Sequence, residues 1–394
     1  MAGKRVPQRL LVAASLIWLA GTSIVREPYP ARAESAVVTS NAWARIPIPG
    51  LPGGIYQHLS ALVVYRDQLY TGVQTGGPLQ IWRSPDGLAW TGVVTETEFN
   101  ASTLGTSLLD LAVVGDALYA ATLTSGSGGA IWRTVDGESW EAVRPRQYPS
   151  VWYFNLASFQ GRLYAHFSAS DVITDPPSDQ VLTTSNGVDW VVAREPDFTI
   201  SSLSSVAGWL YVGGRRPSDK KPRLWRFDGT IWEDVSTDFQ SITDGRVQTV
   251  QPFAGALYAV TTAVTPEALT VVGLWRSPDG RHWAPVPSSD VARIQAANDY
   301  VLQASLRIFR NELFLFTYDL GTGDVWHSSD GEHWEPATPN GWISGQSRGV
   351  TRAGAAVFND RLWAGTVTIG AADDVLLYLP ERLPLPAIFD FDHP

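Results

Sequence analysis

The sequence has no cysteine, and this absence excludes several chemistries together. Without thiols the chain has no disulfide, no thiolate metal site and no cysteine nucleophile. Charged residues are also sparse, at 17%, and the formal net charge is −10. Nucleic-acid binding relies on clustered lysine and arginine, so nucleic acid is not an expected partner. The sequence contains no phosphate-binding loop motif, no dinucleotide-binding glycine motif and no His-Glu-x-x-His zinc motif. We therefore predict no cofactor and no metal.

Long apolar runs are missing after the N-terminus, and the one run near the start is typical of a secretory signal peptide. Basic residues precede an apolar run at 10–20, and the Ala-Arg-Ala stretch at 31–33 offers a cleavage site. The run is shorter than the roughly 20 residues that a membrane-spanning helix needs. We therefore predict removal of residues 1–33, with residues 34–394 forming one secreted or periplasmic domain without membrane insertion. An uncleaved anchor is the alternative.

A ten-residue block recurs along the chain and gives the strongest structural signal. It reads Ile-Trp-Arg-Ser-Pro-Asp-Gly-Leu-Ala-Trp at 81–90, with close copies at 131–140, 274–283 and 325–334 and degenerate copies at 181–190 and 224–232. The Asp-Gly or Asn-Gly pair in each block is typical of a tight turn, because glycine supplies positive φ and Asp or Asn accepts hydrogen bonds from nearby backbone. Each block therefore predicts a β-hairpin.

A second hairpin precedes every block, and its second strand begins with leucine followed by an aromatic residue. These pairs are Leu69-Tyr70, Leu118-Tyr119, Leu163-Tyr164, Leu210-Tyr211, Leu257-Tyr258, Leu313-Phe314 and Leu362-Trp363. Two hairpins make a four-stranded antiparallel blade. The composition, with 17 Trp, 35 Gly and 26 Pro, also favours an all-β protein of short strands.

Six tryptophans, each at the start of the last strand of a block, recur at a spacing of roughly 50 residues and indicate six blades. They are Trp90, Trp140, Trp190, Trp232, Trp283 and Trp334. A seventh copy begins at Asp374 and stops after its third strand, whereas the stretch 39–48, with Trp43, looks like the missing end of a block. We predict a seven-bladed β-propeller whose N-terminal strand completes the last blade and closes the ring, protecting strand edges from aggregation.

The block at Ser84-Pro85-Asp86-Gly87-Leu88-Ala89-Trp90 resembles the Asp box of bacterial neuraminidase (BNR) repeats, a mark of sialidase-type propellers. The resemblance covers nearly the whole mature chain. It implies the fold but selects no function, because Asp-box propellers include sialidases, xyloglucanases, a photosystem II assembly factor and secreted proteins of unknown role. It also implies that the aspartate of each box braces its own turn, on the face opposite the ligand entrance.

The inner strands can be aligned by counting back from the leucine of each pair. The seventh residue back is apolar in every blade, which predicts a column packed between blades. The column is Leu62, Leu111, Leu156, Leu203, Val250, Leu306 and Ala355. Its neighbours on either side should face the central channel, and most are small or neutral polar residues. The repeated tryptophans are predicted to be buried between blades, with a role as sugar platforms as the alternative.

Ligand-binding residues are expected on the loops that enter each inner strand and on those joining the second strand to the third. The segment 144–153 concentrates aromatic and basic side chains, which suit sugars or acidic peptides, while simple capping of the channel mouth is the alternative. The predicted ligand-binding residues are Arg144, Arg146, Tyr148, Trp152, Tyr153, Trp342, Arg348, Asp110, Arg307 and His58.

An enzyme would need acidic groups that converge at the mouth. A glycosidase uses two carboxylates about 5–9.5 Å apart, and a sialidase-like site adds an arginine triad. Entrance-loop candidates are the carboxylates Glu96, Glu98, Glu195, Asp197, Asp238, Asp244 and Asp290 and the arginines Arg144, Arg146, Arg246, Arg293, Arg348 and Arg352. No pair or triad stands out. A further group, Asp171, Asp175 and Asp179, is predicted to form a solvated loop, with a calcium site as the alternative.

The sequence therefore favours a secreted, monomeric propeller that binds a glycan or an extracellular protein without catalysis. The alternative is a secreted glycoside hydrolase, sialidase-like or β-glucan-cleaving, or a lyase that uses entrance-loop carboxylates.

Overall fold

The computed structural model describes residues 43–47, 56–74, 79–94, 106–124, 127–144, 151–169, 178–266, 270–287, 289–296, 301–319, 323–337, 347–369 and 374–378. Within these residues the chain forms 28 β-strands, one short α-helix, α1 (Asp290–Ala296), and one 3-10 helix, η2 (Thr237–Ser241). The protein is all-β, as predicted. No helix of the described ranges has the length and apolar character needed to cross a membrane.

The strands fall into seven sets of four, numbered here as blades 1 to 7. Blade 1 is β2 (Tyr56–Tyr65), β3 (Gln68–Gln74), β4 (Gln80–Ser84) and β5 (Thr91–Val94). Blade 2 is β6 (Thr106–Val114), β7 (Ala117–Thr124), β8 (Gly128–Thr134) and β9 (Glu141–Arg144). Blade 3 is β10 (Val151–Phe159), β11 (Arg162–Ala169), β12 (Ser178–Thr184) and β13 (Val191–Arg194). Blade 4 is β14 (Thr199–Val206), β15 (Trp209–Arg215), β16 (Pro222–Phe227) and β17 (Trp232–Asp234).

The remaining blades include the first strand of the chain. Blade 5 is β18 (Gly245–Phe253), β19 (Ala256–Val264), β20 (Thr270–Ser277) and β21 (Ala284–Pro285). Blade 6 is β22 (Val301–Phe309), β23 (Glu312–Asp319), β24 (Val325–Ser328) and β25 (Glu335–Pro336). Blade 7 is β26 (Ser347–Phe358), β27 (Arg361–Ile369), β28 (Asp374–Tyr378) and β1 (Trp43–Pro47).

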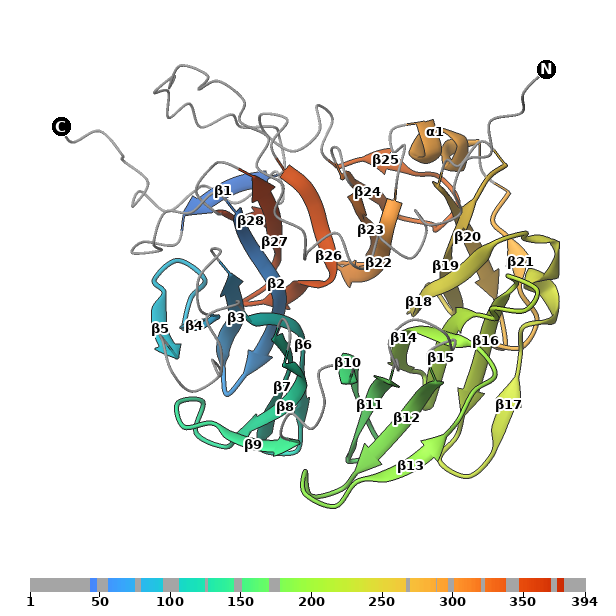
Figure 1. Cartoon of the computed structure of the whole chain (residues 1–394). Helices are drawn as coiled ribbons and strands as arrows, with labels where there is room; N and C mark the ends of the chain where they lie inside the picture. Colours follow the sequence, from blue (N-terminus) through green and yellow to red (C-terminus); the bar gives the residue numbers. More distant parts are fainter. Residues whose placement is uncertain are drawn as a thin grey trace, which may run out of the picture. The chain divides into compact units, whose positions relative to one another are not determined.

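The pairing of these strands confirms the predicted seven-bladed propeller. Blades 2, 3, 4 and 5 are separate four-stranded antiparallel sheets. Blades 1, 6 and 7 have the same internal pairing but share one 12-stranded sheet, because β2 also pairs with β27 and β23 with β26. The first strands of successive blades contact one another in a closed cycle that returns from β26 to β2. Figure 1 shows the sheets around a common centre.

The N-terminal strand closes the ring. Strand β1 pairs antiparallel with β28, with Trp43 opposite Tyr378 and Ile46 opposite Val375. Trp43 and Ile46 are each only 4% exposed, so the strand supplies core side chains as well as backbone hydrogen bonds. This confirms the predicted completion of the last blade.

The repeated turns are braced by their aspartates. Oδ1 of Asp136 accepts hydrogen bonds from the backbone N–H groups of Glu138 and Ser139, both at 2.8 Å. These two bonds, that of Glu138 first, lower the pKa of Asp136. In blade 3 the amide oxygen of Asn186 makes the same pair of bonds at 2.9 Å. The same geometry recurs at Asp86, Asp228, Asp279 and Asp330, which confirms the local structural role.

The glycine of each box also fits the blade that precedes it. Gly137, with φ of 82°, lies so close to Tyr70 of blade 1 that a Cβ would come within 3.0 Å of the Tyr70 hydroxyl. Gly280 has the same relation to Tyr211, and Gly331 to Tyr258. The box turn and the leucine-aromatic pair are therefore two halves of one contact between neighbouring blades, except in blade 4, where Gly229 lies against Gln160. This contact explains why both patterns repeat together in the sequence.

The hydrophobic core lies between adjacent blades. Tyr70 and Ile81 of blade 1, for example, pack in one cluster with Leu108 and Trp132 of blade 2. Burial of the repeated tryptophans is confirmed at Trp90, Trp140, Trp283 and Trp334, whereas Trp190 and Trp232 are half-buried. The predicted apolar column is buried at six of its seven positions, with Leu203 half-buried.

Part of the predicted channel lining is buried, and the inner strands also carry β-bulges. The register shifts between Leu108 and Asp110 in β6 and between Val247 and Thr249 in β18, and similar shifts occur in the other inner strands. A bulge re-aims the side chains beside it. Residues predicted to face the channel are buried at Ala61, Asn155, Ser202, Thr249 and Ser305, each at most 4% exposed.

Candidate functional site at the mouth of the ring

Asp110 and Arg307, two predicted ligand-binding residues, tie neighbouring inner strands together. Asp110 accepts hydrogen bonds from the N–H of Leu111 and, in the next blade, from the N–H of Leu156, both at 2.9 Å. Nε of Arg307 donates to the carbonyl oxygen of Ala355 in blade 7 at 2.9 Å. Leu156 and Ala355 are equivalent members of the apolar column. A ligand role for Asp110 or Arg307 stays a prediction beside this structural one.

Arg144 lies at the outer edge of its blade. The register runs from Asp110 through Ala121 and Ile131 to Arg144, across all four strands of blade 2. Three strand spacings separate the ends of this row by roughly 14 Å. The structure therefore does not bring Arg144 and Asp110 together.

The register places six inner-strand residues at one level, called here the mouth level. In each of these six blades, the partner of this residue on the second strand lies five positions after the leucine of the leucine-aromatic pair. The mouth level is therefore near the strand ends opposite the Asp-Gly turns. The pairs are His58 with Gln74, Ser107 with Leu123, Trp152 with Ser168, Thr199 with Arg215, Arg246 with Thr262 and Gln303 with Tyr318. Two predicted ligand-binding residues, His58 and Trp152, thus share a level. Sequence reasoning missed Ser107, Thr199 and Gln303, which only the register reveals.

The other predicted residues take different positions. Arg348 lies on β26 between Ser347, paired with Thr368, and Val350, paired with Thr366, which places it near the mouth level. Tyr153 lies one residue inward, at the position where other blades carry buried apolar residues. Those residues are Leu59, Leu108, Ile200 and Val247. Arg146, Tyr148 and Trp342 lie outside the described residues, as do the side chains of His58, Trp152, Tyr153 and Arg348.

A group of basic residues borders the mouth level in blades 4 and 5. Arg215 pairs with Asp244 through Nη2 at 2.8 Å, and Nζ of Lys220 lies 3.2 Å from the other oxygen of Asp244. Arg246 is exposed and makes no hydrogen bond or ion pair with the described residues. The pKa of Arg246 is nevertheless lowered, first by desolvation and then by the charge of Arg215. The guanidinium therefore reaches water from a position that protein surrounds closely.

The described carboxylates among the enzyme candidates are already engaged in structural contacts. Asp238 accepts from the N–H of Trp283 at 2.6 Å, which satisfies an outer-strand donor of the next blade. Asp290 makes the equivalent bond to Trp334 at 3.0 Å. Glu195 accepts from Gln180, Asp197 pairs with Arg216, and Asp244 pairs with Arg215 and Lys220. Glu96 and Glu98 lie outside the described residues.

A buried polar row joins blades 3 and 4, and it corrects the prediction for Asp179. Nε2 of His166 lies 3.0 Å from Oδ2 of Asp179, and Nδ1 lies 3.1 Å from Nδ2 of Asn155. The same Asp179 oxygen accepts from the N–H of Ile200 in blade 4 at 2.6 Å. Asp179 is 6% exposed within β12, so it is not part of a solvated loop. Asp171 and Asp175 lie outside the described residues.

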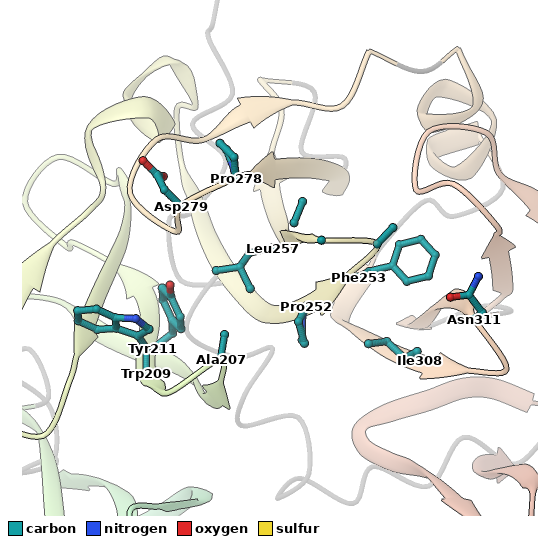
Figure 2. Close-up of a pocket in the computed structure, with 13 residues that line it drawn as sticks. Ala207, Trp209, Tyr211, Pro252, Phe253, Leu257, Pro278, Asp279, Ile308 and Asn311 are labelled. Atoms are coloured by element: carbon teal, nitrogen blue, oxygen red, sulfur yellow. The ribbon is translucent and has the colours of Figure 1, made fainter.

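A groove of about 600 Å³ lies among the turns of blades 4, 5 and 6, at the strand ends opposite the mouth level. Figure 2 shows Trp209 toward one end of the groove and Asn311 toward the other. The guanidinium of Arg226 covers one face of Trp209, 4.1 Å from the ring centroid, and Asp279 braces its own box turn. Two of the groups best suited to a ligand are therefore already engaged. Sequence reasoning missed this groove, although no other blade has tryptophan at the position of Trp209.

Comparison with known proteins supports the fold and leaves the function open. No family model matches the chain, and no curated protein matches it. Among solved structures, a puromycin-hydrolysing peptidase of Mycobacterium tuberculosis matches 84% of this chain and 54% of its own, with 8% identity and a TM-score of 0.53. A structure from a study of two prolyl endopeptidases matches 84% and 51%, with 10% identity and a TM-score of 0.53.

A third similar structure is the SapL1 lectin in complex with α-methyl fucoside, which matches 72% of this chain and 96% of its own, with 11% identity and a TM-score of 0.47. The present chain spans about half the length of the two peptidase structures. At these identities the likeness concerns the fold alone, and the chemistry of those proteins is not transferred to this chain.

Proposed function

We propose that the protein is a secreted or periplasmic Asp-box propeller that binds a glycan at the mouth level and does not cleave it. The register places serine, threonine, glutamine, histidine, tryptophan and arginine residues at the mouth level, one in each of blades 1 to 6. Hydroxyl and amide groups suit the hydrogen bonds of sugar hydroxyls, and an aromatic face suits the apolar face of a sugar ring.

The observation that carries this proposal is the scarcity of carboxylates on the inner wall. Asp110 is the one acidic residue in the seven inner strands, and it holds two backbone N–H groups. A two-carboxylate glycosidase needs a free acid and a free base or nucleophile about 5–9.5 Å apart. A carboxylate that already accepts two backbone hydrogen bonds is poorly placed to carry a proton to a leaving group.

The alternative is a glycoside hydrolase or lyase whose carboxylates come from entrance loops such as the one with Glu96 and Glu98. A protein ligand is the other alternative, because aromatic and arginine side chains also anchor protein interfaces. Both alternatives use the same face of the ring, so the ligand class must be decided by experiment.

A glycan-array measurement on the mature protein, combined with turnover assays on fluorogenic sialosides and β-glucans, tests the proposal. We expect saturable binding without turnover, and loss of binding in Trp152→Ala and Trp342→Ala. The matched control is Trp209→Ala, which removes a half-buried tryptophan at the opposite strand ends and should leave binding unchanged. Turnover would establish the hydrolase instead. Absence of both glycan binding and turnover would favour a protein ligand.

A further inference from the structure

The basic group beside the mouth is built on an ordered connection between β15 and β16. The N–H of Arg216 donates to the carbonyl oxygen of Lys221 at 2.9 Å, which closes the connection on itself. The N–H of Gly245, the first residue of β18, donates to the carbonyl oxygen of Lys220 at 3.0 Å. The connection of blade 4 is thus fixed to the strand of blade 5 that carries Arg246.

Two residues beside these hydrogen bonds have unfavourable backbone conformations. Lys220 and Asp244 each have φ of 60°, which is uncommon for residues other than glycine. Every other described non-glycine residue with positive φ lies in a turn between the first and second strands of a blade. Lys220 and Asp244 are instead at the mouth end and form an ion pair with each other. Strain of this kind persists where the surroundings over-determine it, which is common at ligand sites.

The charge of this corner is opposite to that of the whole chain. Six cationic side chains stand here against three carboxylates, in a protein of net charge −10. The cations are Arg215, Arg216, Lys220, Lys221, Arg223 and Arg246, and the carboxylates are Asp197, Asp219 and Asp244. The carboxylates are all bound to other cations of the corner, so Arg246 remains without an ion pair among the described residues.

We infer that Arg246, with Arg215 and Lys220 beside it, binds a carboxylate of an acidic glycan, such as a uronic acid, at the mouth level. This inference rests on the proposed glycan-binding function and adds the class of ligand. A guanidinium offers two parallel donors that match the two oxygens of a carboxylate, and no described residue occupies those of Arg246. The pKa of Arg246 stays lowered although the charge of Asp244 raises it, and a second anion beside the guanidinium would further offset the desolvation and the repulsion from Arg215.

The test compares two ligands that differ only in charge. Oligogalacturonate and its fully methyl-esterified form share one sugar backbone, and binding of each is measured by calorimetry at low ionic strength. We expect the native protein to bind the acid form about tenfold or more tighter than the ester, as is typical of a charge-assisted hydrogen bond. Arg246→Ala should abolish this preference, and Arg246→Lys should restore part of it, since lysine keeps the charge but lacks the fork.

The matched control is Arg276→Ala, which removes an equal charge from blade 5. Arg276 is exposed on β20 and pairs with Glu332, away from the mouth. We expect this variant to keep the native preference for the acid form. Equal binding of acid and ester by the native protein would overturn this inference while leaving glycan binding in place. Binding of poly-glutamate without binding of either sugar would overturn both proposals, and a preference that survives in Arg246→Ala would assign the carboxylate to other residues.

Discussion

Replacing Gly137 by alanine tests the contact on which the packing of the blades depends. At φ of 82° an alanine costs about 1–2 kcal/mol in backbone strain. Its Cβ would also overlap the hydroxyl of Tyr70 in the neighbouring blade, and overpacking of this kind costs about 1–3 kcal/mol. The free energy of unfolding should therefore fall by about 2–5 kcal/mol, which for a domain of this size lowers Tm by roughly 3–7 °C.

Two further variants separate the strain from the overlap. Gly115 has φ of 60°, and nothing lies within 4 Å of the position that a Cβ would take there, so Gly115→Ala reports backbone strain alone. Tyr70→Phe removes the overlapping oxygen, and the next ring atom lies 3.1 Å from the new Cβ position of Gly137→Ala. The Tyr70 hydroxyl also raises the pKa of Arg83, so Tyr70→Phe alone has an effect of its own and must be measured to complete a double-mutant cycle.

Thermal and urea unfolding is measured for Gly137→Ala, Gly115→Ala, Tyr70→Phe and the double variant Tyr70→Phe/Gly137→Ala. The results give the coupling free energy between residues 70 and 137. Tyr70→Phe should recover about 1–3 kcal/mol of the loss in Gly137→Ala. If Gly137→Ala proves no more costly than Gly115→Ala, or if Tyr70→Phe relieves nothing, then the glycine serves only its own turn and the argument for paired repeats is wrong.

Three other changes have expected outcomes. Because hydrogen bonds lower the pKa of Asp136, its stabilising contribution is fully present above the unfolded-state pKa of about 4 and is lost as pH falls from there through the lower pKa of the folded state. Asp136→Asn, which imitates Asn186, should therefore weaken the dependence of the urea midpoint on pH from about 5 downward, and an unchanged dependence would count against the assignment. Asp110→Ala leaves the backbone N–H groups of Leu111 and Leu156 without this acceptor, so the free energy of unfolding measured with urea should fall by about 1–3 kcal/mol. A loss of ligand binding at unchanged stability would make Asp110 a ligand residue instead. A chain that starts at residue 48 lacks β1 and the burial of Trp43. It should therefore unfold at a lower temperature, and its exposed strand edge should cause aggregation that light scattering detects and that increases with protein concentration. A monodisperse sample of unchanged Tm would refute the closing role of β1.

The blades could be predicted from sequence because each local signal is repeated. The Asp-Gly turn, the tryptophan after it and the leucine-aromatic pair occur at regular spacing, so a degenerate copy such as Asn186-Gly187 is recognised from its neighbours. The place of Trp43 follows from the same comparison. The stretch 39–48 resembles only the end of a repeat, and the repeat that begins at Asp374 lacks that end.

The candidate site was harder to predict, for two physical reasons. Alternation along a strand separates its two faces but does not show how closely each face is covered, so Thr249 and Ser202, which the alignment predicts to face the channel, are buried in the structure. The entrance connections also differ from blade to blade and offer no internal reference, which is why the sequence predicts a loop at Asp179 and does not distinguish Arg246 from the other entrance arginines. The mouth level depends on pairing between strands, which a sequence does not display.

The closing strand has a consequence for the order in which the molecule folds. Strand β1 is synthesised before its partner β28, and all the other strands lie between them in the sequence, so the seam cannot form until β28 has been made. Contacts of such sequence separation form slowly, because a long loop must close before the pairing repays it. The seam rests on five paired residues, which makes it the place where the finished ring is expected to open first when the protein is heated or pulled.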